Sequence, residues 1–170
     1  VHLHWINQGM LSLKNIQKIL ESGKPVIWTM HDMWPCTGIC HFTKGCTNYQ
    51  QECNYCPYIY GGGGKKDLST RVFRKKKELY KMAPITFVAR NRFLEEQARK
   101  SALLSGMTVM SIPNPVNTVH FKPRNKISSR KELDLPQNLR LILFNSSEVT
   151  ERSFLVDVCK GLVEKYPGLK

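Results

Sequence analysis

The feature that most constrains the fold of this chain is an alternation of short apolar runs with segments of helical periodicity. The apolar runs lie at 25–30, 85–89 and 108–112, and residues 1–5 alternate in a pattern that also predicts a strand. Apolar residues at helical spacing lie between them, at 13–20, 67–81 and 93–103. A strand, a helix and a second strand within about 30 residues form a βαβ unit, for which parallel pairing is the default. The sequence therefore predicts an α/β fold built on a parallel sheet with flanking helices.

Two stretches interrupt this alternation. Residues 31–64 form a Cys-rich insert that ends in four consecutive glycines, where we expect a flexible hinge or loop. Residues 114–138 are basic and rich in proline, and we interpret them as a linker. A further apolar run follows at 139–144 and a helical segment at 153–166. We therefore expect an α/β domain over 1–113, a linker over 114–138 and the start of a second α/β domain over 139–170.

The chain is strongly basic, with a net charge of +13, which favours anionic partners. The charge is concentrated over residues 65–100, which hold twelve basic and four acidic side chains. Within 65–81 the basic residues alternate with apolar ones, a pattern that suits peripheral contact with an anionic membrane, although a solvated helix face is the simpler alternative. No nucleic-acid-binding motif is present, so no nucleic acid partner is expected. No apolar run is long enough for a transmembrane helix.

The insert contains five of the six cysteines. Four of them have spacings that suit a tetrahedral zinc site, Cys40, Cys46, Cys53 and Cys56, and the last pair is a Cys-x-x-Cys. A structural zinc ion would explain how a long loop with few apolar residues stays ordered. Disulfides and free thiols are the alternatives, and His41 could replace one cysteine. Cys36 is left over, and Cys159 lies on a predicted helix, where a core position is the simplest interpretation.

Two polar residues follow the apolar run at 25–30. His31 and Asp32 lie where the predicted strand ends, and ligands of open parallel sheets bind at that edge. Histidine is close to neutral at physiological pH and can exchange hydrogen bonds with sugar hydroxyls, while an aspartate can orient it. The alternative is that both residues only cap the loop.

Three segments together carry a resemblance to a known family. They are Thr29-Met30-His31-Asp32-Met33-Trp34, Thr37-Gly38-x-Cys40-His41 with Cys53-x-x-Cys56-Pro57, and Ile112-Pro113-Asn114-Pro115-Val116-Asn117 with Phe121-Lys122-Pro123. In this order, the chain resembles family 4 (group 1) glycosyltransferases of bacterial surface-polysaccharide clusters. The family has the GT-B fold of two Rossmann-like domains, so the chain would join part of the first domain to the start of the second.

The resemblance implies retaining transfer of a sugar from a nucleotide-diphosphate sugar to a hydroxyl of a glycan or lipid-linked acceptor, without a catalytic metal. His31 would lie near the transferred sugar, with Asp32 supporting it. Arg152 would neutralise the donor diphosphate, and Asn114 would belong to the interdomain hinge. A cytoplasmic setting, at the inner face of the membrane, would follow.

The chain begins without an initiator Met or a signal peptide, and the family's two donor-binding glutamates have no counterpart within it. We therefore expect an internal fragment that is inactive alone. A different class of function remains open at this point, namely a zinc-stabilised basic binding module that acts on an anionic membrane or nucleic acid.

Overall fold

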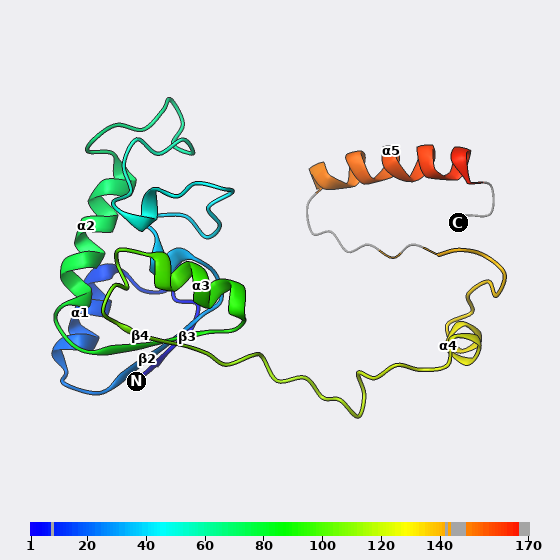
Figure 1. The fold of residues 1–170 in the computed structure, drawn as a ribbon, viewed down its shortest axis with the longest axis horizontal. Helices are drawn as coiled ribbons and strands as arrows, with labels where there is room; N and C mark the ends of the chain where they lie inside the picture. The colour runs from blue at the N-terminus through cyan, green and yellow to red at the C-terminus, as the bar shows by residue number, and fades with distance from the viewer. Residues whose placement is uncertain (8, 142, 144–148, 167–170) are drawn as a thin grey trace. The chain divides into compact units, whose positions relative to one another are not determined.

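The computed structural model describes residues 1–7, 9–141, 143 and 149–166, without the side chains of 149–155. The chain divides into two compact units, Val1–Pro115 and Val116–Lys170, which are described separately. The first unit contains, in chain order, β1 (His2–Leu3), α1 (Leu13–Glu21), β2 (Val26–Met30), α2 (Leu68–Tyr80), β3 (Ile85–Ala89), α3 (Arg92–Lys100) and β4 (Thr108–Ser111) (Figure 1).

The four strands form one parallel sheet in the order β1-β2-β3-β4, which confirms the predicted α/β class and the Rossmann-like arrangement. The strands β2, β3 and β4 lie where the sequence places them. The first strand is shorter than the predicted 1–5, because only His2 and Leu3 pair with β2. The carbonyl of His4 instead accepts a hydrogen bond of 3.0 Å from the indole of Trp28.

The three helices of the sheet lie on one of its faces (Figure 1). Successive right-handed crossovers in a strand order that never reverses place every helix on the same side. Trp28, Phe87 and Val109 face those helices and are buried. On the other face, Ile27 and Met110 remain 43% and 41% exposed. This face is therefore only partly covered, although a parallel sheet normally has both faces covered.

Side-chain caps begin the three helices. Ser12 forms a capping box with Asn15 at α1, and Asn91 caps α3. At α2 the carboxylate of Asp67 accepts hydrogen bonds from the side chain of Ser69 and from the backbone and side chain of Thr70. Burial opposes ionisation of Asp67, but these bonds and one from the Cys56 backbone hold its pKa well below the usual value.

The insert contains only two short 3-10 helices, η1 (Trp34–Cys36) and η2 (Asn48–Gln50). Its glycine run differs from the expected hinge, because it forms a tight turn against the start of α2. The amide of Tyr55 donates to the carbonyl of Gly64 at 3.1 Å. Gly63 lies so close to Cys56 and Asp67 that a Cβ there would overlap both residues. The glycines therefore permit close packing in this turn.

The second unit contains α4 (Lys126–Glu132) and α5 (Val149–Lys165). The helix α5 confirms the helical segment predicted at 153–166, although it begins earlier. The helix α4 lies within the stretch predicted as a linker and buries none of its residues. The strand predicted at 139–144 falls partly outside the described residues. No helix in the described part of the chain has the length and apolar character to cross a bilayer.

Candidate functional site

Histidines from two neighbouring strands meet at the carboxyl edge of the sheet. His4 follows β1 and His31 follows β2, and Nδ1 of His4 lies 3.1 Å from Nε2 of His31. The ring of His2 is centred 4.2 Å from that of His4, and its Nε2 lies 2.8 Å from the hydroxyl of Thr29. Parallel strands end at one edge, so the topology brings these imidazoles together. The cluster can exchange hydrogen bonds with a polyhydroxylated ligand.

The pKa of His31 is lower than that of a free histidine. Burial is the main cause, and the nearby His4 and Arg90 act in the same direction, while Asp32 partly opposes them. His31 is therefore neutral at physiological pH, with one ring nitrogen able to donate and the other able to accept. That state suits hydrogen bonding to a sugar hydroxyl or general-base catalysis.

Asp32 is buried and hydrogen-bonds to His41, whereas from the sequence it was expected to support His31. Its Oδ2 accepts hydrogen bonds from Nδ1 of His41 at 2.6 Å and from the indole of Trp5 at 2.8 Å. Its Oδ1 accepts from the backbone amide of Trp34 at 2.8 Å. No hydrogen bond joins Asp32 to His31 among the described residues. Asp32 therefore fixes the first turn of the insert onto the end of β1 and leaves His31 to pair with His4.

A lysine is buried beneath the insert. Lys76 lies on α2, is fully buried, and its ammonium donates to the carbonyls of Trp34, Thr37 and Gly38 at 2.6, 2.9 and 3.2 Å. The ammonium also lies 3.3 Å from the ring centre of Trp34. Burial lowers its pKa well below the usual value. Because Lys76 is buried, the basic face expected over 65–81 lacks this residue.

The four cysteines selected from the sequence gather around one small cavity. Cys40, Cys46, Cys53 and Cys56 all line it. Burial, and after it the other three cysteines, raises the pKa of Cys40 to about 11. Burial also raises the pKa of Cys53 to about 11, against a hydrogen bond from the amide of Gly38 that favours its thiolate. Cys40 and Cys53 are therefore protonated thiols at neutral pH.

All six cysteines are free thiols in the structure. Cys36 belongs to the core, where its Sγ lies 3.7 Å from the sulfur of Met30 and burial raises its pKa to about 12. Cys159 lies on α5 and is only half-buried, which corrects the core position expected for it. The reason is that α5 leaves several of its apolar side chains exposed, including Val156 and Val163.

The two remaining residues singled out from the sequence lie apart from the histidine cluster in the chain. Asn114 is exposed in an irregular segment just before the boundary between the units at Pro115 and Val116. Arg152 lies in the first part of α5, where the side chains fall outside the described residues. The roles expected for both residues therefore stay predictions.

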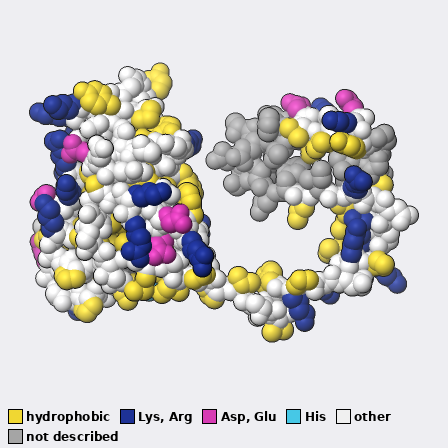
Figure 2. Space-filling model, in the orientation of Figure 1, with side chains coloured by type: hydrophobic (Ala, Val, Ile, Leu, Met, Phe, Trp, Pro, Cys, Tyr) yellow, Lys and Arg dark blue, Asp and Glu magenta, His cyan; other side chains and the backbone are white. Residues whose placement is uncertain are grey.

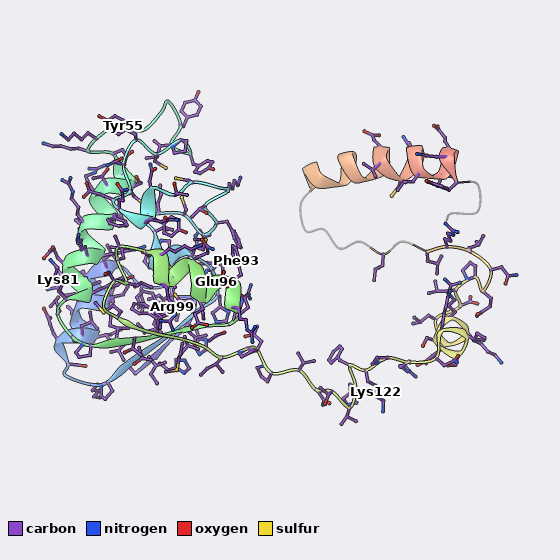
Figure 3. All side chains as sticks on the ribbon, in the orientation of Figure 1. Tyr55, Lys81, Phe93, Glu96, Arg99 and Lys122 are labelled. Carbon is purple, nitrogen blue, oxygen red and sulfur yellow. The ribbon has the colours of Figure 1, made fainter. Side chains whose placement is uncertain are left out.

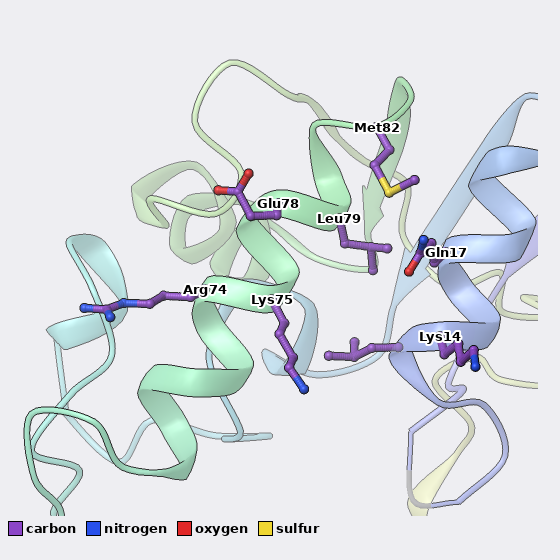
Figure 4. Close-up of a pocket in the computed structure, with 8 residues that line it drawn as sticks. Lys14, Gln17, Arg74, Lys75, Glu78, Leu79 and Met82 are labelled. Carbon is purple, nitrogen blue, oxygen red and sulfur yellow. The ribbon is translucent and has the colours of Figure 1, made fainter.

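An open groove lies away from these residues. It has a volume of about 730 Å³ and separates α1 from α2 (Figure 4). Its lining mixes charges with apolar groups: Leu13, Lys14, Gln17, Arg74, Lys75, Glu78, Leu79 and Met82. None of these residues belongs to the histidine cluster or the cysteine cavity. The volume of this groove is therefore no reason to assign the chemistry to it.

Comparison with known proteins gives one informative match. Over 65 residues the chain is 34% identical to "Putative colanic acid biosynthesis glycosyl transferase WcaC" of Escherichia coli K12. This chain is related to a glycosyltransferase. The matched stretch covers 35% of this chain and 16% of that protein. No protein-family profile matches the sequence, and no solved structure matches it.

His4 and Lys76 were not singled out from the sequence, although both carry a signal, and His41 was considered only as a possible metal ligand. His4 ends a predicted strand that is parallel to the one before His31, so the shared edge could have been inferred. Lys76 lies three residues after Phe73 and four before Tyr80, on the apolar stripe of its helix. No pattern indicates that His41 pairs with Asp32 across the irregular turn.

Proposed function

We propose that this chain supplies the acceptor side of a retaining, family 4 glycosyltransferase with the GT-B fold. The enzyme would transfer a sugar from a nucleotide-diphosphate sugar to a hydroxyl of a glycan or lipid-linked acceptor in surface glycan synthesis. The observation that carries the proposal is the match to a glycosyl transferase in a chain that places a neutral His31 at the carboxyl edge of its sheet. The 170 residues alone would not catalyse this sugar transfer.

The proposed roles follow from the chemistry of each group. His31 would hydrogen-bond the transferred sugar or the attacking hydroxyl, and His4 would hold its ring in place. Asp32 would keep Trp5 and His41 fixed at the rim of the site. Arg152 would offset charge on the diphosphate leaving group in the transition state, in place of a metal ion. Asn114 would lie in the hinge through which the domains close.

Binding by the chain itself tests this proposal first. We expect acceptor saccharides at millimolar concentration to shift the imidazole NMR signals of His31, and His31→Ala to abolish the response. His120→Ala is the control, because His120 is exposed and lies in the second unit. In a complete two-domain enzyme that contains these residues, His31→Ala should lower the transfer rate by about 10²-fold or more. An unchanged rate would overturn the assignment of His31.

A specific surface favours membrane contact as part of the same function. Tyr55, Tyr58 and Tyr60 are exposed near the end of the insert, close in sequence to Lys65 and Lys66. Figure 3 shows Tyr55 projecting there, and Figure 2 shows hydrophobic and basic groups side by side on this end of the first unit. We propose that this tip contacts an anionic membrane at its cytoplasmic face. Co-sedimentation with phosphatidylserine vesicles, but not phosphatidylcholine vesicles, tests it.

A further inference from the structure

Four insert cysteines surround a cavity that fits a single atom. Its volume is about 20 Å³, close to the space that one water molecule needs. Cys40 and Cys46 approach it from before η2, and Cys53 and Cys56 from after it. Cysteines from both sides of η2 therefore line one small space.

The backbone beside these cysteines adopts conformations that non-glycine residues rarely take. Lys44, two residues before Cys46, has a φ of +47°, and Tyr55, between Cys53 and Cys56, has a φ of +42°. Such positions cluster at ligand clamps, where the surroundings compensate for the local strain. Both turns lie next to cysteines that line the shared cavity.

The surroundings of the cavity are suited to negative charge on sulfur. The amide of Gly38 donates to Sγ of Cys53 at 3.3 Å. Lys76 is fully buried and bonds to the carbonyls of Thr37 and Gly38 in the same turn. Among the residues that the structure describes, no carboxylate forms an ion pair with Lys76. The buried amino group of Lys76 therefore lies beside the turn whose Gly38 amide bonds to Cys53.

We propose that Cys40, Cys46, Cys53 and Cys56 bind one Zn²⁺ ion as a structural tetrathiolate site. Each thiol would release its proton to water and bond through sulfur to the ion at about 2.3 Å. The four thiolates and the divalent ion carry a net charge of −2, which the Lys76 ammonium partly offsets. Soft thiolate ligands in a tetrahedral set favour zinc over magnesium or calcium.

Within residues 1–7, 9–141, 143 and 149–166, no three His, Cys, Asp or Glu side chains are yet grouped as metal ligands. Zinc binding therefore requires the four thiols to turn inward onto the cavity that they already line. The ion would tie together a segment that has no long helix or strand. The same segment contains His41, which bonds to Asp32. This role is independent of the proposed transferase activity.

Metal analysis of the intact chain tests the proposal. Reduced protein, purified without a chelator or a metal-affinity step, should contain about one zinc ion per chain. Replacement of zinc by cobalt should give the intense visible bands of a tetrahedral thiolate complex. Cys53→Ser and Cys56→Ser should each reduce bound zinc to near zero, and chelation should expose the cysteines to thiol reagents.

Two cysteines outside the cavity provide the controls. Cys159→Ser should leave zinc content and stability unchanged. Cys36→Ala should lower stability by removing a buried sulfur but should retain the metal, which separates ligand loss from unfolding. Metal-free protein with six titratable thiols would overturn the proposal, and so would a zinc content that is unaffected by Cys53→Ser.

Discussion

The sheet and the insert of the first unit are stabilised in different ways. The sheet and its helices share a continuous apolar core in which Trp28 stacks on Phe87, with ring centres 5.8 Å apart. The insert depends more on directional contacts. The hydroxyl of Thr37 donates to the carbonyl of Cys40, and the hydroxyl of Ser101 donates to the carbonyl of Cys36, at 2.7 and 2.6 Å.

This difference decides how each region should respond to change. Apolar burial is non-directional, so the sheet tolerates substitutions that preserve volume and pattern. A buried polar contact has few alternatives, and the loss of one partner leaves the other unsatisfied. The insert should therefore depend on particular residues, and damage to it should stay local while the sheet remains folded.

The largest effect is expected from the core of the sheet. Trp28 is 1% exposed, and Trp28→Ala should reduce the free energy of unfolding by about 3–5 kcal/mol, because it removes buried area and leaves a cavity. Urea denaturation measures this change. The control is Ile27→Ala on the same strand, where 43% of the residue is exposed and about 0.5 kcal/mol is expected. Equal losses in both variants would contradict the assignment of the buried face.

A smaller effect is expected where the insert meets α2. Lys76→Met keeps the aliphatic stem but leaves the carbonyls of Trp34, Thr37 and Gly38 without their donor. We expect a loss of about 2–3 kcal/mol in the free energy of unfolding. Amide hydrogen exchange should accelerate first at residues 34–41, while the strands stay protected.

Lys75→Met is the matched control for that experiment, because Lys75 is the neighbouring residue on α2 and is exposed. It removes the same charge without removing a buried donor, so it should change stability by about 0.5 kcal/mol or less. If both variants behaved alike, the effect of Lys76 would come from net charge and not from its contacts with the insert.

The same contrast explains how much could be predicted from the sequence. The strand at 85–89 was predicted with its observed ends, since a buried strand is a continuous apolar run between turn residues. The first strand was predicted too long, because its alternation continues into Trp5, whose indole bonds instead to Asp32. Hydrophobic periodicity indicates which residues are buried, but it does not indicate which polar groups form hydrogen bonds with each other.

In the candidate site too, the position of a residue could be predicted from the sequence but its polar partner could not. The position of His31 at the end of a strand could be predicted from the chain alone, since parallel topology sets that edge. Its partner could not, because Asp32 lies next to His31 in sequence but bonds to His41 across an irregular turn. The gathering of four cysteines agrees with their spacing, whereas the glycine run forms a packed turn, because Gly63 lies against Cys56.

The smallest expected effect is on proton binding at the junction of the two regions. The pKa of His31 is lowered mainly by burial and next by His4, so His4→Asn should raise it towards the value of a free histidine. NMR titration of the imidazole signals measures this shift. His2→Asn is the control, because His2 is not among the groups that lower the pKa of His31, and it should leave the titration unchanged.

The sign of the accompanying stability change follows from linkage. Because the folded-state pKa of His31 lies below 6.5, the unfolded chain binds more protons at pH values between the two pKa values. His31 should therefore lower the stability of the fold as pH falls below 6.5 and through its folded pKa, and have no such effect at higher pH. The His4→Asn variant should reduce this loss, measured as a smaller difference in urea midpoint between neutral and mildly acidic pH. A larger difference would mean that His4 favours protonation of His31 and does not oppose it.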